Sequence, residues 1–197
     1  MKKGRVFVIA GPSGAGKGTV TGLALEKMGA RGTDFHFSVS VTTRTKRRGD
    51  IEGRDYYFVS REDFERLIGE GGLLEYEEVF GSYYGTLKRE VEGFVESCQD
   101  VILELDVKGA LNVKANMPSS LLIFIMPPSI EELHARLLKR GRETDEEMSG
   151  RLEEAPREMG EAERFDVIIV NDDADRAADE LAKVLGGEAG TWKKSNR

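Results

Sequence analysis

The nonapeptide G-P-S-G-A-G-K-G-T at residues 11–19 strongly restricts the folds that this chain can adopt. It directly follows the apolar run at residues 6–10, and apolar positions recur at helical spacing after Lys17. Glycines at this spacing let backbone N–H groups surround an anion, and the next helix directs its positive end at the same point. We therefore predict a phosphate-binding P-loop in which Lys17 reaches the β- and γ-phosphates of a nucleotide. An ordinary Gly-rich turn is the alternative, which the flanking strand and helix patterns disfavour.

Length, composition and charge narrow the class of protein further. The 197 residues are enough for one domain with its own core, and 39% hydrophobic with 33% charged residues is typical of a soluble globular chain. The net charge of −7 argues against general affinity for nucleic acid or for an acidic membrane. Basic residues nevertheless gather at 44–48 and 136–142, which suits small polyanionic ligands, although the first cluster could also be a solvated loop.

The chain carries no feature that directs it out of the cytoplasm. The apolar run at residues 6–10 is too short for a secretory signal, and the run at 121–126 is too short to span a bilayer. The lone Cys98 cannot form an internal disulfide, which fits a reducing cytosol, and we expect it to serve in packing. We expect a cytoplasmic protein.

Strand patterns alternate with helix patterns, which predicts an α/β fold. We expect a parallel sheet of the P-loop NTPase type, with helices on both faces and the ligand at the carboxyl ends of the strands. The expected strands are residues 6–10, a short run within 35–41, 101–106, 121–126 and 167–171. We also expect helices capped by Ser60 and by Ser129, a last helix at 177–185, and an interruption at Pro156 of the helix that opens near Thr144.

Two segments interrupt this alternation. We expect a single domain over residues 1–197, in which residues 1–37, 91–138 and 156–190 form the core. The segment at about 38–90 includes a strand, turn and strand pattern, and we expect it to be a mobile insertion. The segment at about 139–155 is a charged hairpin that could fold over a ligand as a lid.

Two acidic residues close the expected strand at 101–106. Side chains alternate along a strand, so Glu104 and Asp106 point to one face and can act together. In a P-loop protein an acid at a strand end holds magnesium or its water shell. An acidic strand end that simply meets solvent is the alternative.

Taken together, these motifs resemble the guanylate kinase family over nearly the whole chain. Besides the P-loop they are S-V-S-V-T-T-R ahead of R-x-G-D, then G-R-D-Y, L-L-E, G-S-Y-Y-G-T, L-E-L-D-V-K-G, R-L-L-K-R-G-R-E-T and V-N-D-D. The resemblance implies transfer of the γ-phosphate of ATP to GMP, and to dGMP, giving ADP and GDP. It also implies ATP as co-substrate, Mg²⁺ as cofactor, no nucleic-acid or membrane partner, and leaves open whether the protein is a monomer or a homodimer.

The resemblance assigns a role to each matching residue. The ATP-binding residues are Gly11, Pro12, Ser13, Gly14, Ala15, Gly16, Lys17, Gly18, Thr19 and Asn171. The GMP-binding residues are Ser40, Arg44, Arg47, Asp50, Tyr56, Glu75, Tyr84, Thr86, Glu104 and Asp106. The residues that act in catalysis are Lys17, Arg44, Arg136, Arg140 and Arg151, of which the last three are lid arginines. The metal candidates, binding directly or through water, are Thr19, Glu104 and Asp106.

Guanine chemistry agrees with the assigned acceptor site. Guanine presents N1–H and an N2 amino group beside the acceptor O6, so a carboxylate with hydroxyls is the complementary set. Of the residues above, Ser40, Glu75, Thr86 and Asp106 would read the base, and Arg44, Arg47, Tyr56 and Tyr84 would hold the phosphate. Two other functions stay open: a ribose-phosphate kinase of similar fold, and a non-catalytic guanylate-kinase-like binding module.

Three positions depart from the family pattern. Gly18 replaces the Ser or Thr that usually binds magnesium, Asp50 replaces a Glu, and Lys46 stands where Pro is common. Adenylate kinases also carry G-K-G-T, so by analogy Gly18 favours magnesium held through water. Asp50 is one methylene shorter than Glu, so it would contact a neighbouring arginine either directly or through water.

Overall fold

A parallel sheet forms the centre of the molecule, in the strand order β2-β7-β1-β8-β9 among the described residues. The computed structural model describes residues 3–79, 81–140 and 145–187, without the side chains of residues 33, 139, 140, 145–149, 151 and 152. The strands of this sheet are β1 (Val6–Ala10), β2 (Phe35–Phe37), β7 (Asp100–Glu104), β8 (Leu121–Met126) and β9 (Val167–Val170). The predicted runs at 6–10 and 121–126 coincide with β1 and β8. The predicted runs at 101–106 and 167–171 extend past the ends of β7 and β9, and Asp106 instead caps the following helix.

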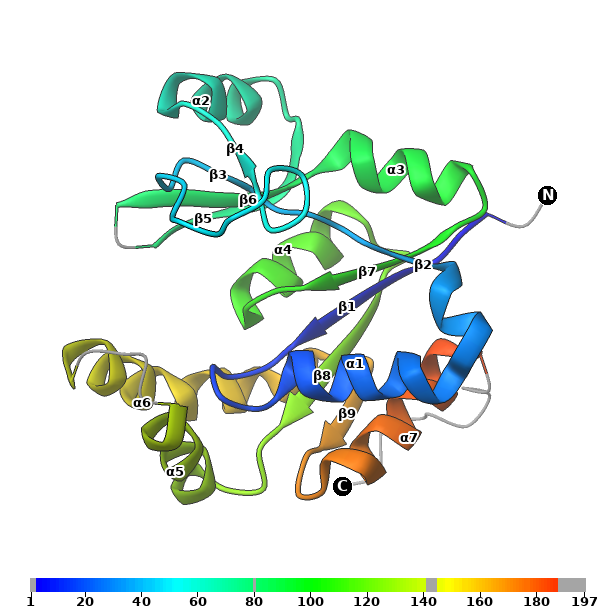
Figure 1. Cartoon of the computed structure of the whole chain (residues 1–197), viewed down its shortest axis with the longest axis vertical. Coiled ribbons are helices and arrows are strands. Elements are labelled where there is room, and N and C mark those ends of the chain that lie inside the picture. The colour runs from blue at the N-terminus through cyan, green and yellow to red at the C-terminus, as the bar shows by residue number, and fades with distance from the viewer. Residues whose placement is uncertain (1–2, 80, 141–144, 188–197) are drawn as a thin grey trace.

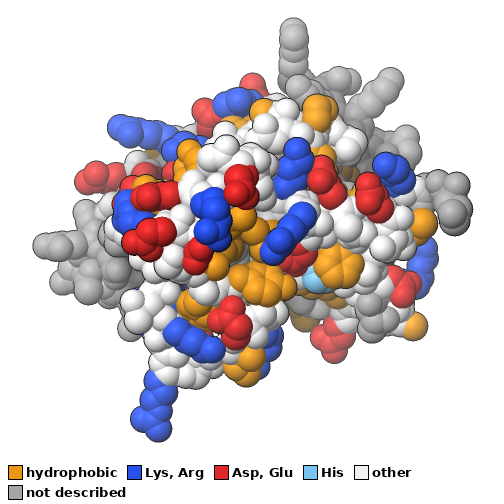
Figure 2. Space-filling view, turned by 90° about the horizontal axis from the view of Figure 1, so that it is seen from above, with side chains coloured by type: hydrophobic (Ala, Val, Ile, Leu, Met, Phe, Trp, Pro, Cys, Tyr) orange, Lys and Arg blue, Asp and Glu red, His pale blue; other side chains and the backbone are white. Residues whose placement is uncertain are grey.

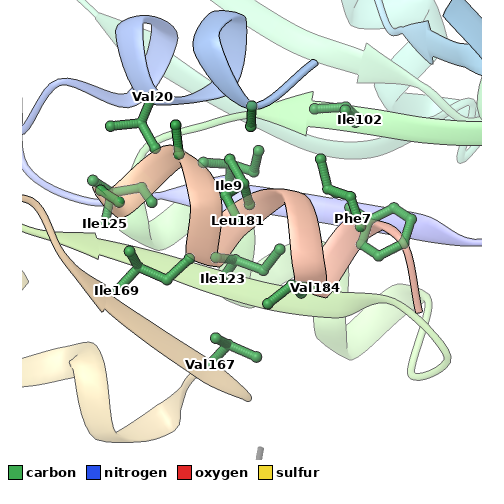
Figure 3. Packing of buried hydrophobic residues seen from close by; sticks show 14 of the residues in the cluster. Phe7, Ile9, Val20, Ile102, Ile123, Ile125, Val167, Ile169, Leu181 and Val184 are labelled. Atoms are coloured by element: carbon green, nitrogen blue, oxygen red, sulfur yellow. The ribbon is translucent and has the colours of Figure 1, made fainter. Parts of the chain in front are cut away.

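Helices cover both faces of this sheet (Figure 1). The helices are α1 (Lys17–Met28), α2 (Arg61–Gly69), α3 (Lys88–Glu96), α4 (Val107–Asn116), α5 (Ile130–Arg140), α6 (Asp145–Gly160) and α7 (Ala174–Leu185), with 3₁₀ turns at Gly29–Asp34 and Glu161–Arg164. Alternate residues of β1 enter different clusters, because successive side chains of a strand point to opposite faces. Phe7 and Ile9 pack with α1 and α7 (Figure 3), whereas Val6 and Val8 pack with α3 and α4.

A second, smaller sheet lies within the expected insertion, in the order β4-β3-β6-β5. Its strands are β3 (Val41–Thr42), β4 (Tyr57–Phe58), β5 (Leu73–Val79) and β6 (Ser82–Leu87). β5 and β6 form the predicted strand, turn and strand, and they pair antiparallel. This sheet and α2 share a small core of their own around Val41, Phe64 and Leu87.

The chain passes from the main sheet into the second sheet beside His36. The predicted run at 35–41 is split between β2 and β3. His36 Nε2 lies 2.9 Å from Glu90 Oε1, and the His36 ring stacks on Phe94 with centroids 3.5 Å apart. The backbone N–H of Val39 also donates to Glu90 Oε1, at 3.4 Å. These contacts join the connecting segment to α3.

Both predicted helix caps are confirmed. Ser60 Oγ accepts from the Asp63 N–H at 3.0 Å, and Ser129 Oγ accepts from the Glu132 N–H at 3.2 Å. The side chain of each serine replaces a backbone partner that the first turn of a helix lacks.

The prediction that Pro156 interrupts a helix is wrong, because α6 runs from Asp145 to Gly160 without a break. Proline removes one backbone hydrogen bond from a helix. The neighbouring Ala155 is fully buried against Leu133 and Leu137 of α5. This packing keeps the turn around Pro156 helical.

The packing role expected for Cys98 is also wrong, since its side chain is exposed. Its backbone has φ of 66°, and the next residue, Gln99, donates its N–H to Phe94 O at 3.0 Å. Cys98 is thus the left-handed residue that follows the end of α3, a position that glycine usually fills.

The surface is charged with both signs. On the face in Figure 2, seen from above, acidic and basic side chains are interspersed around apolar patches rather than separated into one basic area. Among the described residues, no helix combines the length and the apolar character needed to cross a membrane.

Candidate active site

Three glycines give the loop between β1 and α1 its shape. Gly11, Gly14 and Gly16 have φ of 146°, 89° and 92°, a region that side chains disfavour. A Cβ on Gly11 would lie 2.3 Å from Ile125 O, and one on Gly16 would lie 2.4 Å from Asn171 Nδ2. The loop therefore requires glycine at these positions, because its backbone has positive φ and because it packs closely on the core.

The start of α1 has the properties of an anion site. Its N-cap, Gly16, offers no side-chain cap, and the first turn carries no acidic residue. The N–H groups of such a turn favour a phosphate. Lys17 folds back over the loop, where its Nζ donates to Gly11 O at 2.7 Å and to Pro12 O at 3.3 Å. Its ammonium thus lies at the loop that the phosphates would enter.

Asn171 supports the loop from behind. It is buried, its N–H donates to Met126 O at 2.7 Å, and its Nδ2 donates to Ala15 O at 2.7 Å. Arg136 of α5 donates from Nη2 to Asn171 O at 3.1 Å and from Nε to Glu132 at 2.9 Å. Asn171 thus contacts the loop directly and Arg136 contacts Asn171, whereas the side chains of Arg140 and Arg151 lie outside the described residues.

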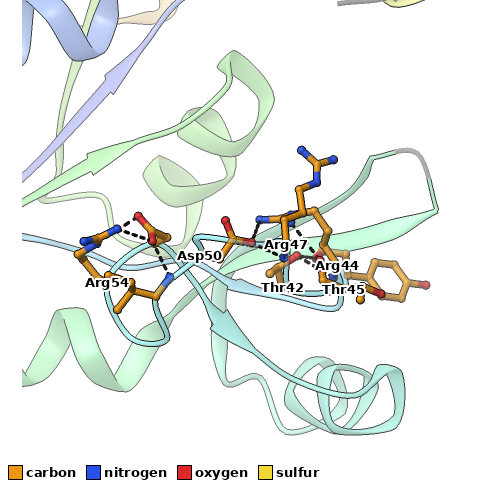
Figure 4. Close-up of polar contacts among 9 residues, drawn as sticks. Thr42, Arg44, Thr45, Arg47, Asp50 and Arg54 are labelled. Atoms are coloured by element: carbon orange, nitrogen blue, oxygen red, sulfur yellow. Dashed lines mark hydrogen bonds and ion pairs between the residues drawn. The ribbon is translucent and has the colours of Figure 1, made fainter. Parts of the chain in front are cut away.

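The segment between β3 and β4 carries a network of arginines around Asp50 (Figure 4). Asp50 Oδ2 accepts from the Arg47 N–H at 2.8 Å and from Arg44 Nη2 at 2.9 Å. These hydrogen bonds, first that of Arg47 and then that of Arg44, hold the pKa of Asp50 below its usual value. The Arg44 guanidinium lies 5.1 Å from the ring centre of Tyr56, whose ring meets that of Tyr84 edge-on at 5.8 Å. Asp50 thus contacts Arg44 directly, without an intervening water.

A buried carboxylate and hydroxyl lie two residues along the β5–β6 pair from Tyr84. Glu75 of β5 pairs in register with Thr86 of β6, whose Oγ1 donates to Glu75 Oε1 at 2.6 Å. Burial raises the pKa of Glu75 to about 7, against the lowering effect of the Thr86 hydrogen bond, and the Asp106 charge raises it further. A neutral carboxyl at this place would become charged when donors approach it.

The first turn of α4 packs directly on this carboxylate. Asp106 is the N-cap of α4, and its Oδ1 accepts from the Gly109 N–H at 2.6 Å. A Cβ on Gly109 would lie 3.1 Å from both Asp106 Oδ1 and Glu75 Oε2. Because Gly109 has no side chain, the carboxylates of Glu75 and Asp106 can both lie close to its backbone.

One cleft of about 1600 Å³ joins the two halves. Among the residues expected at the site, its walls include Gly11, Ser13, Lys17, Ser40, Tyr56, Glu75, Tyr84, Glu104 and Asp106. The other described residues expected at the site are not among those that line this cleft, namely Pro12, Gly14, Ala15, Gly16, Gly18, Thr19, Arg44, Arg47, Asp50, Thr86, Arg136 and Asn171. The P-loop and the Glu75 site therefore face a common space.

Glu104 is the carboxylate best placed for a metal. It ends β7, and its Oε2 lies 3.6 Å from the position that a Cβ of Gly18 would take. Among the described residues, no group of three His, Cys, Asp or Glu side chains could hold a metal on its own. One carboxylate beside a phosphate loop suits Mg²⁺, which keeps several waters and binds substrate phosphates. The chain therefore fits a magnesium ion carried with a nucleotide.

The sequence analysis missed several residues of this cleft. They include Glu77 and Lys108, which form an ion pair, and charged residues of α6 and of the turn that follows it, namely Glu153, Glu154, Arg157, Glu158, Glu161 and Arg164. The position of Glu77, two residues after Glu75, was a signal that it shares the Glu75 face. No local pattern pointed to the residues of α6.

The fold and the site together define a P-loop protein with two facing sites, one for nucleotide phosphates and one built around a carboxylate and arginines. Such an arrangement is suited to the transfer of a phosphoryl group between two bound molecules.

Comparisons with known proteins identify the family. The family model described as "Guanylate kinase" matches residues 3–188. A guanylate kinase of Clostridium tetani is 45% identical over 188 residues, covering 95% of this chain and 88% of its own, and one of Thermus thermophilus is 44% identical over 186 residues, covering 94% and 82%. The crystal structure of guanylate kinase from Anaplasma phagocytophilum superimposes with a TM-score of 0.73 at 37% identity, covering 96% of this chain and 88% of that one. The chain belongs to the guanylate kinase family, as its motifs indicated, and the predicted α/β fold is confirmed.

Proposed function

We propose that this protein transfers the γ-phosphate of ATP to GMP, and to dGMP, giving ADP and GDP or dGDP. The observation that carries the proposal is the single cleft lined both by the P-loop and by Glu75. A ribose-phosphate kinase would have no use for the set of Glu75, Tyr84 and Thr86. A binding module without catalysis would have no use for Lys17 in an intact P-loop. Membership of the guanylate kinase family likewise disfavours both alternatives.

Recognition of guanine rests on the buried Glu75. Its carboxylate accepts from N1–H and N2–H₂ of the base, while hydroxyls such as those of Ser40 and Thr86 complete the polar contacts. Adenine has an unprotonated N1, which would turn an acceptor toward the carboxylate. A buried polar group left without its partner costs enough to reject the wrong base by roughly 10⁴-fold.

The phosphate of GMP is the nucleophile and is already ionised, so the reaction needs no strong general base. Arg44, Arg47, Tyr56 and Tyr84 hold this phosphate, and Asp50 orients the Arg44 guanidinium and accepts from the backbone N–H of Arg47. Lys17 and the loop N–H groups hold the phosphates of ATP. Catalysis then consists of positioning and of neutralising the charge that develops on the transferred group.

Arg136, Arg140 and Arg151 are the further cations that we assign to the transfer. Arg136 donates to Asn171 O and to Glu132, and Asn171 in turn contacts the P-loop at Ala15. Closure of the insertion at about 38–90 and of the lid at about 139–155 excludes water, which would otherwise compete with GMP for the phosphoryl group. Residues 1–37, 91–138 and 156–190 form the core on which both close.

A magnesium ion bound with ATP would supply charge neutralisation at the phosphates. Glu104 and Asp106 would hold it through its water shell, and Thr19 would hold it directly or through water. Gly18 leaves room for a water between α1 and Glu104, since the nearest atom to a Cβ at this position is Glu104 Oε2 at 3.6 Å. We place the enzyme in the cytoplasm, acting on free nucleotides and not on nucleic acid or membranes.

ADP release measured with each nucleoside monophosphate tests the proposal. With ATP and Mg²⁺ present, we expect rapid ADP release on addition of GMP or dGMP, and far slower release with AMP, CMP or UMP. Mass spectrometry should identify GDP as the second product. Equal rates with and without an acceptor would refute the proposal, because they would indicate a simple ATPase.

A further inference from the structure

We propose that Lys108 is a positioning residue for the acceptor, because it neutralises Glu77 and so keeps a second carboxylate from repelling the phosphate of GMP. The inference rests on the proposed function and concerns the same cleft. Glu77 and Lys108 both line this cleft, and they form an ion pair between β5 of the second sheet and α4 of the core.

The strand register puts Glu77 beside the phosphate end of the acceptor site. Glu75 pairs with Thr86, and Glu77 pairs with Tyr84. Residues two apart on a strand share a face, so the two rungs lie side by side toward the cleft. Directly opposite residues of an antiparallel pair have Cβ atoms about 5 Å apart. When the guanine base of GMP lies at the Glu75–Thr86 pair, its phosphate therefore lies near the Glu77–Tyr84 pair.

Lys108 reaches Glu77 from the first turn of α4. The Lys108 side chain is 74% exposed, whereas Glu77 is only 20% exposed and its Oε1 is covered from solvent. The ammonium thus lies against the less exposed carboxylate and offsets its charge.

Loss of Lys108 would uncover this charge without detaching the strand. A second contact also joins α4 to β5, since Asn116 Nδ2 donates to Leu74 O at 2.7 Å. Glu75 keeps its own contact with the start of α4 at Gly109. The main effect of removing the ammonium is then electrostatic, and it falls on the doubly charged phosphate of the acceptor.

Steady-state kinetics of Lys108→Gln test the inference. We expect KM for GMP to rise at least about fivefold. This value is the repulsion between the uncovered Glu77 charge and a doubly charged phosphate, taken at a separation of about 8 Å in a medium with the dielectric constant of water. We expect kcat and KM for ATP to stay within about twofold. Lys108→Arg should restore the KM for GMP, and so should Glu77→Gln added to Lys108→Gln. The matched control is Lys88→Gln, which removes the same charge from an exposed pair with Glu92 of α3.

Inhibition by guanosine separates the phosphate effect from a disturbed base site. Guanosine lacks the phosphate, so its inhibition constant against GMP should change less than twofold in Lys108→Gln. An unchanged KM for GMP, a failure of Glu77→Gln to restore it, or an equal loss of guanosine affinity would each overturn the inference. The wild-type GMP kinase rate, measured first, tests the proposed function separately.

Discussion

Replacing the buried Glu75 by Gln should make the free protein more stable at alkaline pH and weaken its binding of GMP. Glu75 is 7% exposed, and its described contacts are the Thr86 hydroxyl and the first turn of α4. No cation is among these contacts. Glutamine has the same shape as the protonated side chain and keeps an oxygen that can accept from Thr86.

The magnitude follows from the pKa of Glu75, which burial raises from 4.5 to about 7. Below pH 4.5 the Glu75 carboxyl is protonated in both the folded and the unfolded chain, so its ionisation does not lower the free energy of unfolding. Between pH 4.5 and 7 the unfolded chain loses the proton first, so the free energy of unfolding falls. This pKa difference between the folded and unfolded chain lowers the free energy of unfolding by about 3 kcal/mol by pH 8.

Thermal unfolding of the ligand-free protein from pH 4.5 to 8 provides the assay. Relative to wild type, Glu75→Gln should gain about 3 kcal/mol between these limits, or about 6 to 12 °C in Tm for a chain of this size. At pH 7.5, KM for GMP should rise about 10- to 100-fold, as expected for lost hydrogen bonds to a charged group, while ATP affinity stays nearly constant. A constant Tm difference between the proteins across this pH range would refute the assigned pKa, and an equal loss of ATP affinity would refute the role in base recognition.

Three further substitutions test the remaining parts of the site. Gly16→Ala forces a Cβ to 2.4 Å from Asn171 Nδ2 at φ of 92°, so we expect a cost of about 2 kcal/mol, seen as a Tm lower by about 4 to 8 °C and as weaker ATP binding in calorimetry. Asp50→Asn weakens the contact that orients Arg44, so KM for GMP should rise about tenfold, whereas an unchanged value would indicate that the phosphate alone orders this arginine. Glu104→Gln should raise the Mg²⁺ concentration needed for half-maximal rate several-fold with KM for GMP unchanged, and an effect on GMP alone would remove it from the metal site.

The P-loop, its flanking elements and the core were predictable because local sequence determines them. Three glycines that need positive φ, followed by Lys17, leave little freedom to the loop. The apolar strands are buried on both faces, which gives the continuous runs seen at 6–10 and 121–126. Each cap required only two residues three positions apart. In such cases the determining contacts lie within a few residues of one another.

Other features depended on contacts between distant segments and were missed or wrong. The helix through Pro156 is maintained by Ala155 packing on α5, which no local rule reveals. The ion pair of Glu77 and Lys108 joins residues 31 positions apart and requires the placement of α4 on β5. Similarly, the Glu90 contact of His36 spans 54 positions. Propensity rules describe none of these, because tertiary packing decides them.

Glu75 and Glu77, two residues apart on one face of β5, show why the same residue type at nearby positions needs opposite surroundings. At the first rung, Glu75 is buried with a hydroxyl but no cation among its described contacts, so the N–H groups of guanine are the donors that can stabilise its charge. A lysine there would satisfy the carboxylate in advance and remove the preference for guanine over adenine. At the second rung the ligand itself is an anion, so an unpaired Glu77 would repel it, and Lys108 supplies the compensating charge. The first turn of α4 therefore places its lysine, Lys108, against Glu77 and not against Glu75. This placement preserves the selectivity for guanine at Glu75 and lets the phosphate bind near Glu77.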